Sequence, residues 1–433
     1  MTKVYIGMTM DILHHGHINI LSEARKHGDV IVGLLTDRAI AEHKRLPYLS
    51  WDERRTIVSN IVGVTEVVEQ DEWDYAPNLL NYQPDIMIHG TDWLDGPLGP
   101  YREKALAALQ TYGGKLIEVP YTRGVSSSEI QEDLLKIGTT PDIRRTSLRR
   151  LLAAKPVSRF IEAHNPVSAL IAENISVTHQ GRLREFDGFW SSSLVDSTIR
   201  GKPDTESLDI DTRLANINEI FDVTTKPLIF DMDTGGKLEH LQGRIKSIER
   251  LGISAVIIED KRGLKKNSLL GNEVAQEQED TELFCNKIRT ARAGRVSEDF
   301  MVIARVESLV LERGMEDALL RAEAYSQAGA DGIMIHSKKT VADEVMEFAA
   351  RFRTRNPSLP LVVVPTSFHQ VSIETLAGAG FNIVIYANQL LRAAYPAMSR
   401  VAESILTRGS TTDIESDLMP IADILNLIPG TRE

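Results

Sequence analysis

The sequence predicts an α/β protein with an N-terminal doubly wound parallel sheet and a C-terminal (β/α)8 barrel. Short β-branched runs alternate with amphipathic stretches along the 433 residues, which is typical of parallel βαβ units. This alternation stops at a polar, basic stretch over residues 138–150 and then starts again. Eight further strand candidates follow, separated mostly by helical patterns. That number and the length of chain they occupy match one barrel.

Five strands and four helices are expected in the first unit. The strand candidates are residues 3–8, 29–36, 65–70, 85–90 and 115–121. The helical patterns are residues 17–27, 52–61, 100–112 and 128–137. The stretch G-T-T-P-D-I-R-R-T-S-L-R-R combines Gly, Pro and an Arg cluster, so we expect a linker there. The predicted domains are therefore residues 1–140 and 141–433.

Polar side chains gather where the barrel strands end. The strand candidates are residues 159–164, 186–192, 227–233, 255–260, 300–307, 331–337, 359–365 and 382–388. The polar residues at their carboxyl ends are Ser191 to Ser193, Asp231, Asp233, Glu259 to Lys261, Arg305, Glu307, His336, Thr366 and Asn388. One such residue is ordinary in a loop. Their presence on seven of eight strands predicts an active site at that rim, where barrels build theirs.

Composition excludes several classes of protein. The formal net charge of −12 disfavours nucleic-acid binding, which usually needs a basic surface. No apolar run approaches the ~18 residues of a membrane span, and the N-terminus does not read as a signal peptide. Cys285 is the single cysteine, so we expect neither an internal disulfide nor a cysteine-built metal site. A cytoplasmic protein without a membrane or nucleic-acid partner is predicted.

A phosphate site is expected directly after the first strand. The segment D-I-L-H-H-G-H places His14, Gly16 and His17 at a strand-to-helix turn. Gly16 lets the backbone approach a phosphate, and the helix start offers unpaired N–H groups. Two imidazoles three positions apart can face one point and hold a triphosphate as charge moves onto leaving pyrophosphate. Chance histidines beside a core helix would give the same short pattern.

Three further segments strengthen this interpretation. Lys44 lies in the loop after the second strand, H-G-T-D-W spans residues 89–93, and Y-T-R-G-V-S-S-S-E-I spans residues 121–130. With the H-x-G-H segment, they make residues 3–137 resemble the cytidylyltransferase family of nucleotidyltransferases. Related adenylyltransferases share H-x-G-H, so ATP stays open as an alternative to CTP.

The resemblance implies a Mg²⁺-dependent CTP site with His14, His17 and Lys44 as catalytic residues. The nucleotide-binding residues implied are Met8, Thr9, His14, Gly16, His17, Lys44, Asp92, Trp93, Thr122, Arg123, Ser126, Ser127 and Ser128. Arg55 would contact the phosphorus group of the acceptor. One departure is Tyr121, where the family has arginine; Arg123 is the candidate substitute.

A second site is expected on the barrel. Asp231, Asp233, Glu259 and Glu307 are carboxylates on neighbouring strand ends, and such a cluster suits Mg²⁺ with retained waters. Cationic and polar groups suited to a phosphate and a carboxylate accompany them: Lys261, Lys265, Asn267, Ser268, Arg305 and His336. Each of these alone would more often be a solvated charge or a salt-bridge partner.

Residues 147–430 resemble phosphoenolpyruvate mutases of the isocitrate lyase superfamily. The segments that carry this resemblance are E-D-K-R-G-L-K-K-N-S, F-D-M-D-T-G, I-A-R-V-E, M-I-H-S-K-K and Y-A-N. The resemblance implies that Asp231 binds Mg²⁺ directly, and that Asp204, Asp233 and Glu259 act through waters. The implied catalytic residues are Asp231, Lys261, Lys265, Asn267 and Arg305. The implied substrate-binding residues are Trp190, Ser192, Ser193, Leu194, Asn267, Ser268, Arg305 and His336. Ser193 departs from a family glycine.

The implied reaction converts phosphoenolpyruvate to phosphonopyruvate under a closing loop that bears Lys265, Asn267 and Ser268. Lyases of this superfamily carry a cysteine on that loop, and this sequence has none there, because Cys285 falls within a later helical pattern. A phosphonopyruvate hydrolase is the nearer alternative, and Asn267 favours the mutase.

A chain joining the two units in this order resembles the bifunctional enzymes of fosfomycin biosynthesis. That resemblance implies transfer of CMP to 2-hydroxyethylphosphonate, a small phosphonate. Three alternatives stay open for the first unit: 2-aminoethylphosphonate as acceptor, glycerol 3-phosphate as acceptor, or a degenerate CTP sensor. The tail is expected to form an amphipathic helix over residues 414–428. A homo-oligomer through the barrel is also expected, with exchange of the C-terminal helix at residues 421–428.

Overall fold

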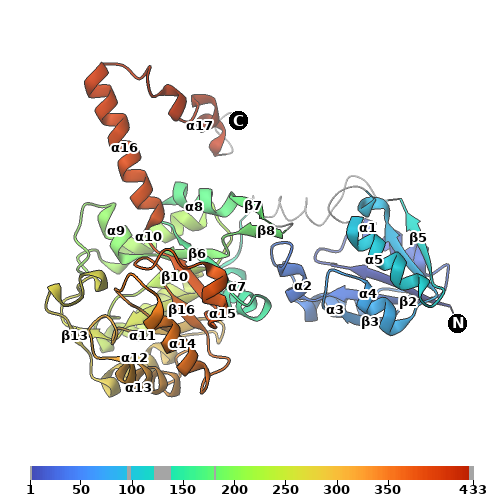
Figure 1. Cartoon of the computed structure of the whole chain (residues 1–433), viewed down its shortest axis with the longest axis horizontal. Helices are drawn as coiled ribbons and strands as arrows, with labels where there is room; N and C mark the ends of the chain where they lie inside the picture. Colours follow the sequence, from blue (N-terminus) through green and yellow to red (C-terminus); the bar gives the residue numbers. More distant parts are fainter. Residues whose placement is uncertain (1, 95–98, 121–137, 180–181, 429–433) are drawn as a thin grey trace.

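The computed structural model describes residues 2–94, 99–120, 138–179 and 182–428. They form a five-stranded parallel sheet within residues 3–119 and a closed eight-stranded barrel within residues 158–386 (Figure 1). The predicted fold class is confirmed. All thirteen predicted strands are present, with bounds that differ by a few residues.

The N-terminal sheet has the strand order β3-β2-β1-β4-β5. Its strands are β1 (Lys3–Met8), β2 (Asp29–Leu35), β3 (Val64–Gln70), β4 (Ile86–Gly90) and β5 (Lys115–Val119). Every neighbouring pair is parallel, and Lys3 lies opposite Asp29 in the β1–β2 register. The strand order reverses at β1, between β2 and β4. The carboxyl end of β1 is therefore a topological switch point, where open α/β sheets bind ligands.

Helices cover both faces of this sheet, as a doubly wound fold requires. They are α1 (His15–Ala24), α2 (Asp37–Ala41), α3 (Trp51–Ser59), α4 (Ala76–Tyr82), η1 (Thr91–Trp93) and α5 (Gly99–Gln110). Val4 and Ile6 of β1 pack with Leu21 of α1 on one face. Tyr5, between them, packs with Leu79 of α4 on the other. Helices α1, α3 and α5 were predicted, whereas α2 and α4 were not; the helix expected at residues 128–137 lies outside the described residues.

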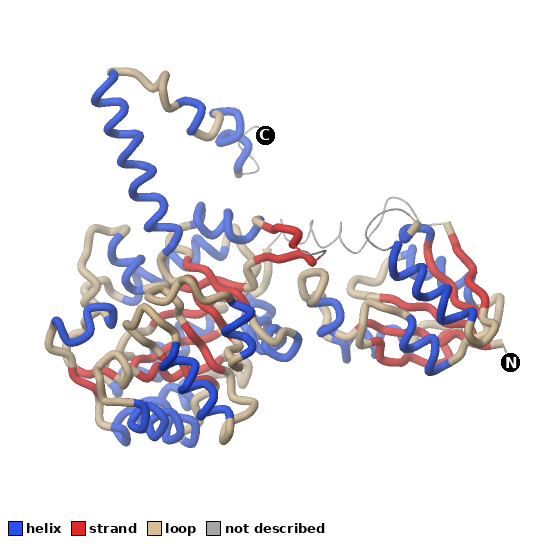
Figure 2. Tube along the Cα trace, in the orientation of Figure 1, coloured by secondary structure: helices blue, strands red, loops and turns tan. Residues whose placement is uncertain are grey.

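The barrel closes with neighbours in sequence order. Its strands are β6 (Ser158–Glu162), β9 (Gly188–Ser191), β10 (Leu228–Asp231), β11 (Ala255–Glu259), β14 (Met301–Val306), β15 (Gly332–Ile335), β16 (Leu361–Val363) and β17 (Ile383–Tyr386). Buried Phe160, Ile229 and Ile303 belong to the cluster that fills its interior. The outer helices are α8 (Pro166–Asn174), α9 (Ser193–Thr198), α10 (Ile210–Phe221), α11 (Leu238–Leu251), α12 (Thr281–Gly294), α13 (Met315–Gln327), α14 (Asp343–Arg353) and α15 (Ile373–Gly378) (Figure 2).

Two hairpins interrupt the βα repeats. One pairs β7 (Ser176–His179) with β8 (Arg182–Glu185), and the other pairs β12 (Lys261–Arg262) with β13 (Glu277–Gln278). The second hairpin encloses η2 (Ser268–Glu273) and begins two residues after β11 ends. It is the loop that the sequence analysis expected to close over the barrel rim.

The predicted linker is wrong for most of its length. Residues 141–150 belong to helix α7 (Pro141–Ala154). Thr140 caps the helix by accepting a hydrogen bond from the Ile143 N–H at 3.4 Å, and Pro141 occupies the first turn, where proline is tolerated. Leu148 of α7 is fully buried in the barrel-interior cluster. The Thr-Pro pair that suggested a linker is therefore a helix start.

The last helices leave the barrel surface. Helix α16 (Gln389–Arg408) extends away from the barrel, and η3 (Glu415–Asp417) and α17 (Ile421–Leu427) follow it (Figure 1). The single amphipathic helix predicted over residues 414–428 is instead divided by an extended segment at Leu418–Pro420. Among the described residues, no helix has the length and apolar character needed to cross a membrane.

Candidate active sites

The turn after β1 is fixed by a buried arginine. Arg54 of α3 is fully buried. Its Nη1 donates to the carbonyl oxygens of Thr9 at 2.5 Å and Leu35 at 2.9 Å. Asp11 accepts a hydrogen bond from the Leu49 N–H at 3.0 Å. These bonds hold the loops after β1 and β2 together at the switch point.

The two histidines of the H-x-G-H segment lie against each other. His14 precedes the first residue of α1, and its ring centroid lies 3.8 Å from that of His17. The His14 N–H donates to His17 Nδ1 at 3.4 Å. Burial, reinforced by the neighbouring His14, lowers the pKa of His17 to about 4. The two rings therefore pack against each other at the start of α1, and His17 is neutral at pH 7.

Lys44 lies in the loop after α2, near Trp73 and Asp92. Its Nζ lies 5.6 Å from the centroid of the Trp73 ring. Burial lowers the pKa of Lys44, while the Asp92 carboxylate opposes that shift. Trp93 is fully buried, stacks on His89 with 3.7 Å between centroids, and donates to Glu118 at 2.8 Å. The Trp93 ring thus packs beneath the segment that carries Asp92.

The other residues predicted for the nucleotide site lie in different environments. Met8 is buried in the sheet core. Arg55 is exposed on α3, 5.4 Å above the Trp51 ring, whereas neighbouring Arg54 points inward. The expected phosphate cradle, namely Thr122, Arg123, Ser126, Ser127 and Ser128, lies outside the described residues, as does the departure at Tyr121.

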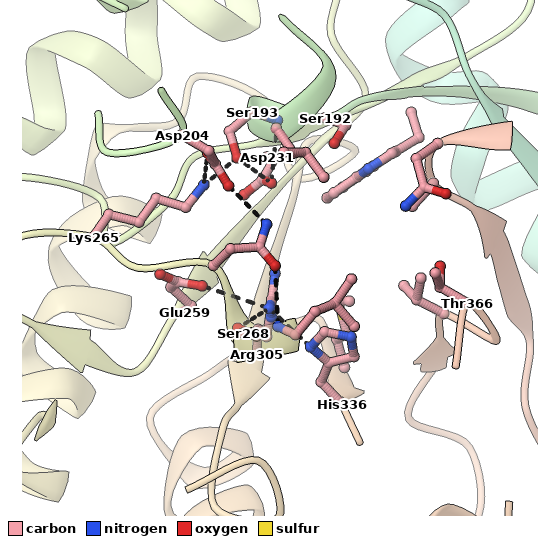
Figure 3. A pocket seen from close by; sticks show the side chains of 18 residues that line it. Ser192, Ser193, Asp204, Asp231, Glu259, Lys265, Ser268, Arg305, His336 and Thr366 are labelled. Atoms are coloured by element: carbon pink, nitrogen blue, oxygen red, sulfur yellow. Dashed lines mark hydrogen bonds and ion pairs between the residues drawn. The ribbon is translucent and has the colours of Figure 1, made fainter. Parts of the chain in front are cut away.

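A pocket at the carboxyl ends of the barrel strands collects the residues proposed for the second site (Figure 3). Seven barrel strands or the loops that follow them contribute to its walls. The lining residues are Trp190, Ser192, Ser193, Leu194, Asp204, Asp231, Glu259, Lys265, Asn267, Ser268, Leu269, Arg305, Met334, His336, Val364, Thr366, Ala387 and Asn388. Of the residues proposed for this site, three stand just outside that wall: Asp233 contacts Lys265, and Lys261 and Glu307 contact Ser268.

Lys265 reaches into a group of carboxylates at one end of the pocket (Figure 3). Its ammonium pairs with Asp204 at 2.9 Å and also contacts Asp233 and Ser193. The Ser193 hydroxyl donates to Asp231 at 2.9 Å. Burial opposes ionisation of Asp231, but the charges of Lys265, Arg305 and Arg213 outweigh it and lower its pKa to about 2.

The opposite end of the pocket is rich in donors. Arg305 donates to the Ser268 hydroxyl at 2.6 Å and contacts His336 Nδ1 at 2.9 Å. Ser268 in turn donates to Glu307 at 2.6 Å, and Lys261 donates to Ser268 at 2.9 Å. Burial opposes ionisation of Glu307, yet Arg305 and Lys261 keep its pKa well below the usual range. This end can receive an anionic group between fixed donors.

The carboxylates fit a hard cation by their chemistry. Both oxygens of Glu259 are buried and accept no hydrogen bond from the described residues, although Lys261 lies 3.4 Å away. Burial raises the pKa of Glu259 to about 7, and a nearby dication would favour its ionised form. No three Asp, Glu, His or Cys side chains within the described ranges are close enough to share one ion directly. The donor set therefore suits Mg²⁺ that keeps several waters.

Sequence reasoning assigned no role to two groups that support the barrel site from behind. Arg213 of α10 is buried and donates to Asp196 at 2.9 Å and to the Asp231 carbonyl at 2.7 Å. Asp260 accepts from the Glu307 N–H at 2.9 Å and from Tyr325 at 2.7 Å. Arg213 lies in no recognisable motif, so its supporting role could not be predicted from the sequence. Asp260 belongs to the E-D-K segment, which is the sequence feature that could have indicated its role.

Comparisons with known proteins match two families to two parts of the chain. Residues 148–406 match the Phosphoenolpyruvate phosphomutase family, and residues 5–133 match the Cytidylyltransferase-like family. The phosphoenolpyruvate phosphomutase of Tetrahymena pyriformis is 33% identical over 66% of this chain and 91% of its own length. The crystal structure of a phosphoenolpyruvate phosphomutase from Streptomyces platensis subsp. rosaceus superposes with a TM-score of 0.60, at 36% identity, over 67% of this chain and 95% of its own. A phosphonopyruvate hydrolase in complex with oxalate and Mg²⁺ gives a TM-score of 0.59 at 32% identity, over 68% of this chain and 96% of its own.

Proposed function

Because the chain belongs to the phosphoenolpyruvate phosphomutase family and carries an N-terminal cytidylyltransferase-like domain, we propose that it is a bifunctional enzyme of phosphonate biosynthesis, of the kind used to make fosfomycin. The barrel domain isomerises phosphoenolpyruvate to 3-phosphonopyruvate. The N-terminal domain transfers CMP from CTP to 2-hydroxyethylphosphonate and releases pyrophosphate. We place the boundary between the two catalytic domains at residues 140 and 141, in front of α7.

In the barrel reaction, the phosphoryl group leaves the enol oxygen and bonds to C3 of the same molecule. Arg305, His336, Asn267 and Ser268 hold the phosphoryl oxygens and fix the line of transfer, because such transfer depends on positioning and charge neutralisation. Ser192 also holds the phosphoryl group, and the Ser193 amide faces the substrate. The hairpin that bears Lys265 excludes water, which would otherwise capture the phosphoryl group.

Mg²⁺ would be held directly by Asp231, with Asp204, Asp233 and Glu259 acting through its waters. When bound, it neutralises the carboxylate and enolate charge of the substrate. In this structure the Lys265 ammonium supplies positive charge to the same carboxylates. Arg213 keeps Asp231 and Asp233 oriented from behind, with Nη1 3.3 Å from Asp233.

One observation carries the choice of mutase: Asn267 and Ser268 of the β12–β13 hairpin line the pocket together with Arg305 and His336. Asn267 donates to Asp204 at 2.8 Å, which places its amide beside the proposed metal ligands. The hairpin has no cysteine, and Cys285 is buried in α12, where its thiol faces the Ala324 carbonyl at 3.6 Å. This arrangement does not support the acid–base chemistry of the lyases.

In the N-terminal reaction, an oxygen of the acceptor's phosphorus group attacks the α-phosphate of CTP. His14 and His17 donate hydrogen bonds to the triphosphate as negative charge develops on pyrophosphate. Lys44 contacts the α-phosphate, and Met8, Thr9, Gly16 and Asp92 form the nucleotide pocket. Arg55, exposed on α3, binds the acceptor. Mg²⁺ would accompany the triphosphate.

The acceptor is assigned from the fusion of the two domains. A phosphonate oxygen serves as nucleophile as well as a phosphate-ester oxygen does, and bridging O and CH₂ differ little in size. Selection for making one phosphonate favours a partner domain that acts on its descendants. We therefore rank 2-hydroxyethylphosphonate above 2-aminoethylphosphonate, and both above glycerol 3-phosphate.

³¹P NMR of the full chain tests both activities. With Mg²⁺ and phosphonopyruvate, a mutase gives phosphoenolpyruvate, whereas inorganic phosphate as the first product would identify a hydrolase. With CTP and each of the three acceptors, we expect the highest kcat/KM for 2-hydroxyethylphosphonate. A higher value for glycerol 3-phosphate would overturn the acceptor assignment. The absence of pyrophosphate with every acceptor would favour a CTP sensor.

A further inference from the structure

Two adjacent residues of the loop after α2 face different domains. We refer to residues 42–50 as the Lys44 loop. The Lys44 ammonium lies beside Trp73 of the N-terminal domain and is influenced by Asp92. Arg45, the next residue, instead turns toward the barrel domain. Figure 1 shows α2, just before this loop, on the side that faces the β7–β8 hairpin.

The Arg45 guanidinium lies among hydrogen-bond acceptors of the barrel domain. Its Nη1 donates to Glu173 Oε1 at 3.0 Å and to Thr225 Oγ1 at 3.4 Å. Its Nη2 donates to the Glu173 carbonyl at 3.3 Å and to Glu185 at 3.3 Å. Glu173 is only 6% exposed, and Lys226 pairs with Glu185 at 3.1 Å. Partly buried, multiply bonded arginines of this kind hold a fixed geometry, unlike surface ion pairs.

A second arginine fastens the other end of the Lys44 loop. Arg150 of α7 donates to the carbonyl oxygens of Pro47 at 2.8 Å and Tyr48 at 3.1 Å. The next residue, Leu49, donates its N–H to Asp11, three residues before the H-x-G-H segment begins at His14. The Lys44 loop is thus tied to the barrel domain at two points and to the histidine turn at a third.

We propose that Arg45 is a positioning residue for nucleotidyl transfer, and that the barrel domain thereby places Lys44 at the α-phosphate. Binding of Arg45 to Glu173 and Glu185 fixes the backbone next to Lys44, so less backbone ordering remains when Lys44 contacts the phosphate. Small displacements of a catalytic group reduce rates strongly. This inference rests on the proposed cytidylyltransferase activity.

The test compares variants of the full chain. Arg45→Ala is expected to lower kcat for pyrophosphate release at least about tenfold, with phosphonopyruvate isomerisation unchanged. Arg45→Lys keeps one charged contact but not the fork, so we expect an intermediate kcat. Glu173→Gln weakens the same contact from the barrel side and should lower the same kcat. Arg38→Ala is the matched control, because Arg38 pairs only with exposed Asp71 at 3.3 Å among its described ion-pair partners.

A double variant separates positioning from general destabilisation. If Arg45 acts through Lys44, then Lys44→Ala with Arg45→Ala loses less than about twofold more than Lys44→Ala alone. Each of three results would overturn the inference. They are a kcat of Arg45→Ala within twofold of the parent, fully additive losses of kcat in the double variant, and a loss of isomerisation in Arg45→Ala equal to its loss of nucleotidyl transfer. No pyrophosphate from the unmodified chain with any acceptor would instead overturn the proposed function, and this inference with it.

Discussion

At the scale of single residues, the protonation of His17 reports directly on its surroundings. Burial and the nearby His14 ring lower its pKa from 6.5 to about 4. The unfolded chain therefore binds more protons than the folded one between these values. By linkage, the His17 contribution to stability is fully present above pH 6.5 and is lost as the pH falls toward 4.

We predict that the His17 ring resonances show no titration between pH 8 and pH 5.5 in the free protein. Adding CTP should raise the pKa of His17, because the triphosphate charge favours the imidazolium form. The measurement is a ¹H–¹³C NMR titration, with His17→Gln to assign the signal. A free-protein pKa at or above the ordinary value of 6.5 would contradict the observed packing, and an unchanged pKa with bound CTP would separate His17 from the phosphates.

Sequence patterns predict the functional side chains that follow strands, but not the side chains that hold those functional residues in place. Asp231, Arg305 and His336 could be predicted because each stands at the carboxyl end of a barrel strand. Arg213 and Arg45 could not, since their partners lie 17 to 22 and 128 to 180 positions away. Arg54 and Arg55 are adjacent, and only the fold decides that Arg54 is buried while Arg55 is exposed.

At the scale of elements, α7 changes the reading of residues 138–150 from linker to structural helix. Arg144 of α7 is buried over the Phe221 ring, with 3.8 Å to its centroid. It donates to the carbonyl oxygens of Lys226 at 3.0 Å and Thr224 at 2.5 Å. Composition alone could not distinguish this helix from a linker, because its Arg-rich sequence is polar and its burial depends on partners in α10 and the loop after it.

We predict that Arg144→Ala lowers the free energy of unfolding of the barrel by about 3 kcal/mol, because it leaves several buried carbonyl groups without a donor. Chemical denaturation followed by circular dichroism measures this change, since three of the four tryptophans lie in the N-terminal domain. Arg289→Ala serves as the control, since Arg289 is half-exposed and its described ion pair is with exposed Glu282. A loss below about 0.5 kcal/mol for Arg144→Ala, comparable to ordinary surface changes, would mean that α7 does not stabilise the barrel.

At the scale of the whole molecule, the two proposed chemistries lie on opposite sides of residue 140. We predict that His17→Ala reduces nucleotidyl transfer at least about 100-fold and leaves isomerisation intact. Asp231→Ala should do the reverse. Parallel assays of both variants, with circular dichroism as a check of folding, measure the separation. A folded variant that lost both activities would refute the model of two independent sites. Because the barrel domain holds the Lys44 loop through Arg45, we expect changes at that contact to affect nucleotidyl transfer but not isomerisation.

The C-terminal helices lead to the last prediction, that the protein is a homo-oligomer assembled through its barrels. Helix α16 has no buried side chain within the described chain, and Tyr395, Met398 and Leu406 are 72%, 61% and 87% exposed. Ile421 and Ile424 of α17 are also exposed, so both helices carry apolar side chains that nothing in the described chain covers. Surfaces of this kind on isolated helices are normally covered by another subunit.

Light scattering coupled to gel filtration should therefore give a mass that is a multiple of the chain mass and independent of concentration. Replacing Ile421 and Ile424 with glutamate should shift the protein toward smaller species, because charged groups would have to be buried in the interface. Glu403→Gln, a change on an exposed polar position of α16, is the control and should leave the mass unchanged. A monomer mass at all concentrations for the unmodified chain would contradict assembly and would require α16 and α17 to fold back on their own barrel.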